Sequence, residues 1–167
     1  MTDPIRPAQT IRPTDDEARG MARDLLTRAR FAALAVGLAD GTPMVTRVAF
    51  GLSPEGAPLT LVSDLSAHTG ALRASPACSL LLGEPGPKGD PLTHPRLTLQ
   101  ATARFVGKGE QGHDTLAAHY LTDHPKARIY IGFADFGFAL FSVRAGHLNG
   151  GFGKAFRLTA ADMGLPG

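Results

Sequence analysis

Apolar residues recur at helical spacing directly after a capping pattern near the start of the chain. Thr14 is followed three residues later by Glu17, which is the arrangement of a capping box. The apolar residues that follow share one helical face; they are Ala18, Met21, Ala22, Leu25, Leu26 and Ala29. The pattern predicts a helix capped by Thr14. Residues 1–13 hold three prolines and show little periodicity, so we expect an extended N-terminal arm there.

Short apolar or alternating runs, separated by turn residues, fill most of the remaining chain. Residues 44–50 alternate, with Met44, Thr46, Val48 and Phe50 on one face and Val45, Arg47 and Ala49 on the other. Further strands are predicted at residues 31–37, 58–62, 77–82, 96–106, 138–144 and 152–158, and helices at 66–74 and 110–120. Residues 83–95 are rich in glycine and proline and predict a long loop with a functional or flexible role.

Six or seven strands with two or three helices between them predict a small barrel decorated by helices, in the mainly β (α+β) class. The alternating βαβ units of a dinucleotide-binding fold are absent from the pattern. The sequence shows no internal repeat and no second domain. We therefore expect residues 14–167 to form a single domain, which suits the length of the chain.

Composition narrows the classes of partner. Hydrophobic residues make up 43% of the chain and charged residues 19%, which is a globular balance. Lys and Arg number 17 against 15 Asp and Glu without clustering, so no nucleic acid is expected and a partner with one or two phosphates fits better. The sequence shows no secretory signal and no apolar run that could span a membrane, and we expect a cytoplasmic protein. Cys78 is the only cysteine and is interpreted as a core residue.

Arg47 stands out because it lies within a strand on a face shared with Val45 and Ala49. An arginine there has to reach solvent or meet an anion, since an unpaired buried charge is costly. Its planar guanidinium can bind two phosphate oxygens at once. Taken alone, however, Arg47 is better explained by a structural ion pair or by an edge position.

A polar run between a strand and a short helix favours the anion-binding interpretation. It contains Ser63, Ser66, His68 and Thr69, and it leads into the predicted helix at 66–74. The first turn of a helix presents free N–H groups and the positive end of the helix dipole, which together attract anions. Ordinary N-capping would explain one of these polar residues but not four.

At these residues the chain resembles the pyridoxamine 5'-phosphate oxidases and related FMN-binding split-barrel proteins. The strand Arg47-Val48-Ala49-Phe50 is similar to their phosphate-binding strand, and residues 62–69 are similar to the segment that follows it. The resemblance covers residues 14–158. It implies a six- to seven-stranded antiparallel split β-barrel with flanking helices, and a homodimer with FMN at its interface and a small-molecule substrate. It further implies that Arg47, Ser63, His68 and Thr69 contact the phosphate, with the backbone of Val48, Ala49 and Val62 near the flavin ring.

Residues 68–72, 120–127 and 147–155 resemble the haem-utilisation (HugZ-like) branch of this group. His147, just before a glycine-rich turn, could approach a flavin or a haem, but simple surface placement explains its position better. The chain ends at Gly167 without the C-terminal Arg/His substrate motif of the oxidases, and also without the C-terminal segment usual in the haem-degrading branch. Neither the sequence nor the resemblance identifies a catalytic residue.

Two other patterns are weaker. Gly151-Phe152-Gly153-Lys154 does not satisfy the phosphate-loop motif and predicts a tight turn. His113, His119 and His124 lack zinc-ligand spacing, so no metal site is expected.

Three hypotheses for the function follow. The first is an FMN-dependent oxidoreductase of unknown substrate. The second is a flavin- or haem-binding carrier without turnover, with a haem-degrading oxygenase as a related alternative. The third is a barrel that has lost its cofactor and serves as an interaction protein.

Overall fold

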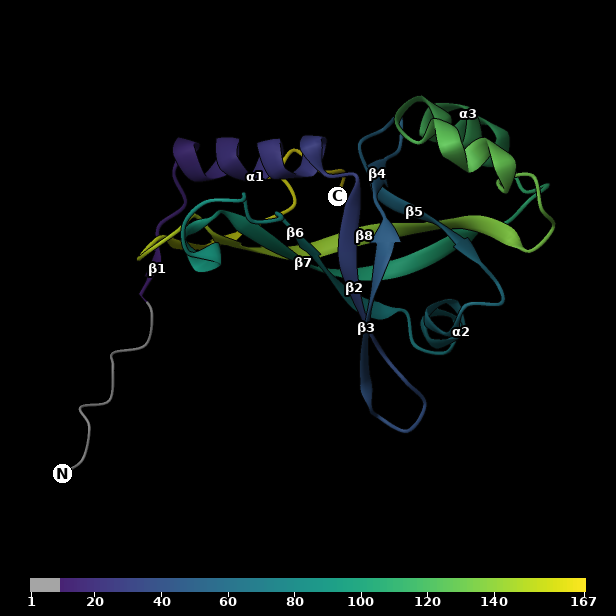
Figure 1. The fold of residues 1–167 in the computed structure, drawn as a ribbon, viewed down its shortest axis with the longest axis horizontal. Coiled ribbons are helices and arrows are strands. Elements are labelled where there is room, and N and C mark those ends of the chain that lie inside the picture. Colours follow the sequence, from purple (N-terminus) through teal and green to yellow (C-terminus); the bar gives the residue numbers. More distant parts are fainter. Residues whose placement is uncertain (1–9) are drawn as a thin grey trace.

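A computed structural model describes residues 10–167 of the protein, and one continuous β-sheet organises them (Figure 1). The hydrogen-bonded order of its strands is β1-β9-β8-β7-β6-β2-β3, while β5 pairs with both β4 and β8. The strands are β1 (Ile11–Arg12), β2 (Phe31–Gly37), β3 (Pro43–Ala49), β4 (Gly51–Leu52), β5 (Pro58–Ser63), β6 (Ala77–Leu82), β7 (Arg96–Val106), β8 (Phe136–Asn149) and β9 (Ala155–Leu158). The helices are α1 (Asp16–Arg28), α2 (Ala67–Ala74) and α3 (His113–Asp123), with 3₁₀ turns η1 (Pro91–Thr93) and η2 (Pro125–Ile129).

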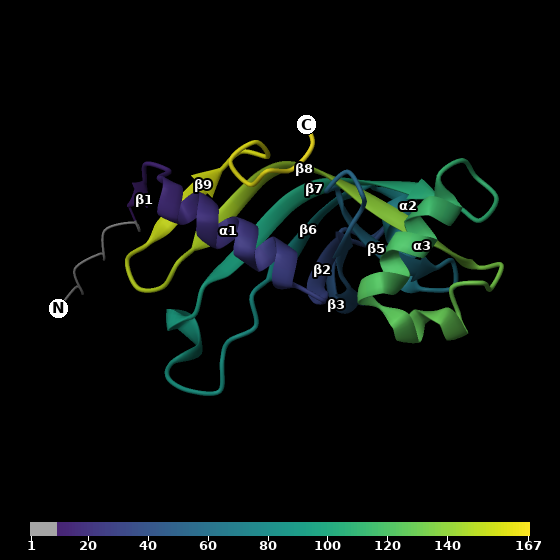
Figure 2. The same ribbon diagram turned by 90° about the horizontal axis from the view of Figure 1, so that it is seen from above.

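The long strand β8 divides the sheet into two parts. Its first half pairs with β5 and its last residues pair with β9, while β7 runs along almost its whole length. The register between β7 and β8 shifts at Gln100/Ala101, which is the signature of a β-bulge. The result is the predicted mainly β split barrel, which is curled but not closed (Figure 2). Two short strands, β1 and β4, bring the number of strands above the predicted six or seven.

Two hydrophobic clusters hold this architecture together. The larger one lies inside the curled sheet, where the apolar face of α1 (Ala18, Ala22 and Leu26) packs against strand residues such as Leu99 and Phe141. The smaller one lies beneath α3; its buried members are Leu59, Val106, Leu116, Tyr120, Ala127, Ile131, Phe138 and Leu140. β8 is therefore covered on both faces along its first half but on only one face further along.

The structure corrects several boundaries predicted from the sequence. The cap of α1 is Asp15, whose carboxylate accepts a hydrogen bond from the Ala18 amide (2.8 Å), whereas the Thr14 hydroxyl donates to the carbonyl of Arg157. The helix predicted at 110–120 begins at His113, because Gly109 and Gly112 adopt positive φ angles that end the preceding turns. β8 runs on to Asn149, past the predicted end at residue 144, because it gains β9 as a partner.

The N-terminal arm lies mostly outside the described residues, since only its last four residues are placed. Of these, Ile11 and Arg12 form β1 and pair in parallel with β9. At the other end, Asp162 joins the C-terminal turn to α1 by accepting a hydrogen bond from Arg19 (2.9 Å). No helix among residues 10–167 is long and apolar enough to cross a membrane.

Candidate functional site

One face of the sheet, between β3 and β9, points away from α1 and from the larger hydrophobic cluster. We call it the outer face and define it by a row of paired residues that crosses six strands. The row runs, in spatial order, through Arg47, Ala33, Leu81, Thr98, His147 and Arg157. Side chains at alternate positions share a face, so Phe31, Val45, Arg96 and Gln100 lie on the outer face as well.

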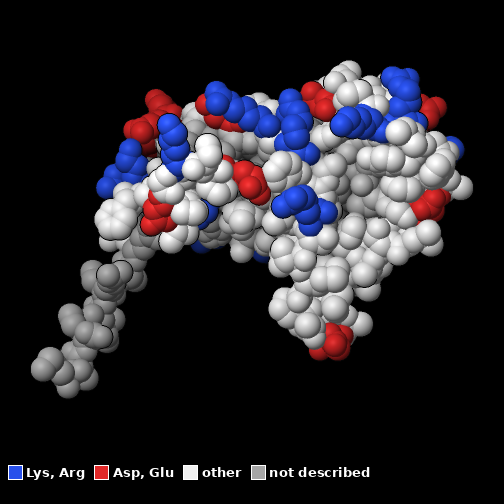
Figure 3. Space-filling view, in the orientation of Figure 1, with Lys and Arg blue, Asp and Glu red and all other residues white. Residues whose placement is uncertain are grey.

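The charges on the strands are all of one sign. The nine strands hold no Asp, Glu or Lys, but they hold six arginines: Arg12, Arg47, Arg96, Arg104, Arg144 and Arg157. The carboxylates lie on helices and loops instead, and Figure 3 shows acidic and basic side chains intermixed along the edge formed by α1 and α3. Strands that carry cations and no carboxylate of their own attract anionic ligands, although Glu84 of the neighbouring loop lines a groove together with Arg47.

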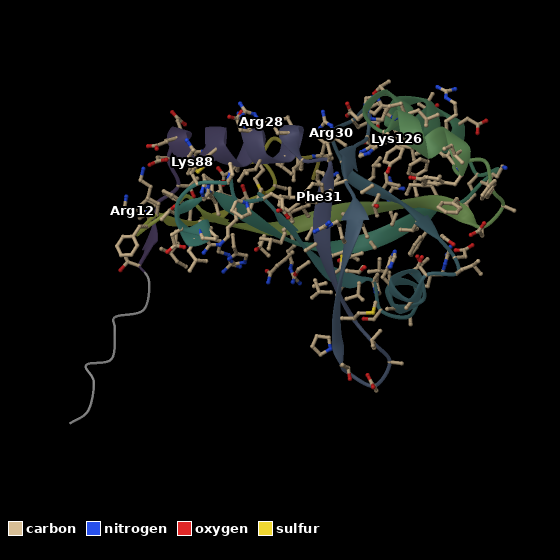
Figure 4. The ribbon with its side chains drawn as sticks, in the orientation of Figure 1. Arg12, Arg28, Arg30, Phe31, Lys88 and Lys126 are labelled. Carbon is tan, nitrogen blue, oxygen red and sulfur yellow. The ribbon has the colours of Figure 1, made fainter. Side chains whose placement is uncertain are left out.

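A groove of about 440 Å³ opens where the outer face meets the loop at residues 83–95. Sheet residues that include Phe31, Arg47 and Leu81 form one wall, and loop residues that include Leu92 and His94 form the other. The Arg47 guanidinium lies over the Phe31 ring, 5.3 Å from its centroid, and makes no ion pair with any described residue. Phe31 lies on the sheet near the end of α1 (Figure 4). Arg47 is thus an exposed cation on an apolar support, rather than half of a structural ion pair.

His147 lies at a different part of the outer face. Its side chain is exposed, it makes no hydrogen bond within residues 10–167, and Arg157 is its direct neighbour on β9. Four inter-strand spacings separate it from Arg47, or about 19 Å at about 4.8 Å each. The structure therefore does not bring His147 and Arg47 to one point.

The polar run at the start of α2 forms a second cluster. The Ser63 hydroxyl donates to Asp135 (2.5 Å) and accepts from the Leu65 amide. The amides of Ala67 and His68, in the first turn of α2, have no acceptor among the described residues. Burial lowers the pKa of the half-buried His68 below its usual value. Free amides and an imidazole at a helix N-terminus suit a phosphate.

The remaining candidates near this cluster are less accessible. Thr69 is fully buried, and its hydroxyl has no hydrogen-bond partner in the described part of the chain. The side chains of Val48 and Val62 are buried in the larger hydrophobic cluster, while Ala49 packs against the smaller one. These three residues can therefore offer a ligand little more than their backbone. The groove beside Arg47 has no lining residue from α2.

Cys78 and the histidines of the α3 region, which the sequence analysis assigned to no functional site, have structural contacts. The Cys78 thiol donates to the Ala101 carbonyl, and burial raises the pKa of the thiol to about 11. His113 is buried against Phe138, and His124 hydrogen-bonds to the carbonyl of Phe50. Within residues 10–167 no three His, Cys, Asp or Glu side chains come together as metal ligands.

Sequence reasoning missed Arg157, Arg96 and Asp135. Arg157 and Arg96 carried a signal, since each is a charged residue in an apolar strand, as Arg47 is. Asp135 lies in a loop 72 residues from Ser63, and nothing local to either residue indicates that they meet.

Comparison with known proteins agrees with this fold. A chloroplastic heme oxygenase of Arabidopsis thaliana, HOZ, is 34% identical over 119 residues, which are 70% of this chain and 35% of that protein. The structure of a heme binding protein from Mycobacterium smegmatis superposes with a TM-score of 0.78 at 28% identity, over 93% of this chain and 62% of that one. The chain thus spans about a third of the first relative and less than two thirds of the second.

HutZ, the heme storage protein of Vibrio cholerae, shares the fold with a TM-score of 0.66 at 21% identity, over 80% of this chain and 90% of that one. Residues 19–149 match the pyridoxamine 5'-phosphate oxidase family, which is most of the chain. The protein belongs to the pyridoxamine 5'-phosphate oxidase family of split barrels, in the neighbourhood of its haem-utilisation members.

Proposed function

We propose that this protein binds haem on its outer face, close to His147. The observation that carries the proposal is an exposed imidazole without a hydrogen-bond partner, beside an arginine, on strands that hold no carboxylate. The Arabidopsis and M. smegmatis relatives, described as a heme oxygenase and a heme binding protein, support the same ligand.

The residues of this face fit the chemistry of haem. A neutral imidazole is the commonest protein ligand of haem iron. Arg157 lies next to His147 and offers a planar partner for a propionate carboxylate. Thr98 and Leu81, which follow in the row, provide small and apolar surface for a flat ring. When bound, haem supplies electron-transfer and oxygen chemistry, while the protein holds and orients it.

FMN is the second candidate, and the first turn of α2 favours it. Two free amides and the side chain of His68 provide donors for a phosphate, and Arg47 on β3 is a free cation. Ser63 would have to exchange its bond to Asp135 for the phosphate, because its hydroxyl proton already points to that carboxylate. With FMN bound, the protein would be a flavin-dependent oxidoreductase of unknown small-molecule substrate.

A homodimer is part of the proposal for either cofactor. Val45, Leu81 and Phe31 remain 65%, 43% and 40% exposed on the outer face, and each is a large apolar side chain. A contiguous exposed apolar patch marks an interaction surface. A second copy would cover it and could bring its own Arg47 or α2 towards the first chain's site.

Absorbance titration tests the choice of cofactor. Purified protein is titrated separately with hemin and with FMN. The proposal expects a Soret band that shifts and saturates with hemin at micromolar concentrations. Saturable flavin binding with no hemin response would instead identify FMN as the cofactor. If neither binds, the remaining hypothesis is an interaction protein without a cofactor. Loss of the Soret band when a reductant and oxygen are added would distinguish turnover from storage.

A further inference from the structure

We propose that His94 is a pH-sensitive clip that holds the loop at residues 83–95 closed beside the outer face. Its Nδ1 atom lies 3.3 Å from the backbone nitrogen of Gly86, and its Nε2 atom lies 2.8 Å from the carbonyl oxygen of Lys88. The loop projects from the sheet in Figure 2, and Lys88 is labelled in Figure 4.

These two partners fix the protonation state of the ring. A backbone amide can only donate, so Nδ1 has to accept and carry no proton. A carbonyl can only accept, so Nε2 has to carry the proton. The loop therefore selects the neutral imidazole with its proton on Nε2. A second proton would go to Nδ1 and remove the acceptor of the Gly86 amide.

The loop is tightly packed against itself and against the neighbouring turn. A Cβ atom at Gly86 would lie 3.1 Å from Cε1 of His94. At the neck of the loop, Gly83 has φ +100, and a Cβ there would lie 2.5 Å from the carbonyl oxygen of Pro95. The turn after β8 abuts the loop, since a Cβ at Gly151 would lie 2.9 Å from the carbonyl oxygen of Thr93. Loops whose ends meet and whose interior is packed by their own side chains are Ω-loops, which frequently carry function.

The charges around His94 come from three elements. Arg47 on β3 and Arg96 on β7 line the same groove as His94, and Glu84 lines it from the loop itself. Arg96 also donates to the Leu92 carbonyl (3.1 Å), which ties the loop to β7. Asp90 accepts from the Leu92 amide and so caps η1. Lys88, the other charged residue of the loop, adds a further cation. These groups are three cations (Arg47, Arg96 and Lys88) and two carboxylates (Glu84 and Asp90), so they do not form an excess of negative charge around the loop.

The consequence is a loop that loosens as the pH falls through the range in which histidines take up a proton, about pH 5–8. Because the loop forms one wall of the groove next to Arg47, the groove widens in acid and is closed at neutral and higher pH. This inference goes beyond the proposed function and holds for either cofactor, since the clip consists of the chain's own atoms.

NMR of the apoprotein tests the clip without any ligand. The ring nitrogens of His94 should report the Nε2-protonated tautomer at about pH 8. The exchange protection of the Gly86 amide, taken relative to the intrinsic rate at each pH, should fall about fivefold on acidification, as expected for one net hydrogen bond. The Gly89 amide, which makes no hydrogen bond within residues 10–167, is the internal control and should not change.

Two variants separate the clip from a general loosening of the fold. His94→Gln keeps one donor and one acceptor, so Gly86 protection should persist and lose its pH dependence. His94→Ala should give low protection at every pH, whereas His119→Gln, on the exposed surface of α3, should behave like the parent protein. Wild-type protection that does not change with pH, or a ring protonated on Nδ1 at about pH 8, would overturn the proposal. Failure of hemin and FMN to bind would overturn only the proposed function.

Discussion

His68 shows how a single residue can make ligand binding depend on pH. Burial lowers the pKa of its imidazole, so the ring is neutral near neutral pH. A phosphate at the start of α2 would favour the protonated ring and raise this pKa, because an anion stabilises a nearby cation. At pH values between the pKa of His68 in the free protein and its higher pKa in the complex, the complex holds a proton that the free protein lacks. The affinity for the phosphate therefore has to rise as the pH falls.

We therefore expect the affinity for a phosphate-bearing ligand such as FMN to increase about tenfold at most between about pH 8 and pH 6. Isothermal titration calorimetry in buffers of different ionisation enthalpy measures both the affinity and the proton uptake. His68→Gln should abolish the uptake. A flat pH profile in the wild-type protein would show that His68 does not contact the phosphate.

Cys78 should be an unreactive thiol. Its pKa of about 11 reflects burial, and the thiolate is the reactive form. At about pH 8 the thiol should react with a disulfide reagent at least about tenfold more slowly than an unperturbed cysteine. Unfolding in denaturant should restore the ordinary rate. A fast reaction in the folded protein would mean that the strand pairing of Cys78 with Ala101 opens readily.

At the scale of elements, residue periodicity predicted most strands, and three of them, β2, β6 and β7, to the residue. The errors lie where distant partners decide the outcome. β8 continues past the expected end because β9 pairs with it, and β1 exists only because β9 offers it an edge. The cap of α1 moved from Thr14 to Asp15 because the Thr14 hydroxyl is engaged by Arg157 on β9. A local pattern does not carry this information.

The neck of the loop at residues 83–95 gives a prediction about stability. Gly83→Ala places a Cβ 2.5 Å from the Pro95 carbonyl oxygen at a positive φ, so it should lower the free energy of unfolding by about 2–4 kcal/mol. Gly89→Ala is the matched control, since it also has a positive φ but open space around it. Gly89→Ala should lower the free energy of unfolding by only about 1 kcal/mol. Chemical denaturation of both variants provides the comparison, and equal losses would mean that the neck can move apart freely.

At the scale of the whole molecule, the outer face is what the sequence could not reveal. Arg47 and Arg157 are visible as charged residues within predicted strands, whereas His147 lies beyond the predicted end of its strand. Their common row depends on the registers of five strand pairs. The same registers place Arg47 and His147 far apart, although the family resemblance suggested both as cofactor contacts. The α2 cluster was recognisable because its residues are adjacent in the chain.

The outer face should also mediate self-association. Val45→Lys adds a cation to a patch that already holds arginines, so it should weaken a dimer by about tenfold or more. Leu65→Lys is the control, because Leu65 is exposed but lies outside the outer face. Sedimentation velocity across a concentration series measures both. A wild-type protein that stays monomeric, or a dimer that Val45→Lys leaves intact, would contradict this assignment of the interface.

The most direct test of the central claim, that haem binds at His147, is a hemin titration followed by absorbance in the wild-type protein and in His147→Ala. In the wild type we expect saturable binding with an imidazole-type Soret band. In His147→Ala we expect a shifted band and an affinity at least about tenfold lower. His119→Ala should match the wild type. An unchanged spectrum and affinity in His147→Ala would contradict the claim, and so would a wild-type protein that binds no hemin.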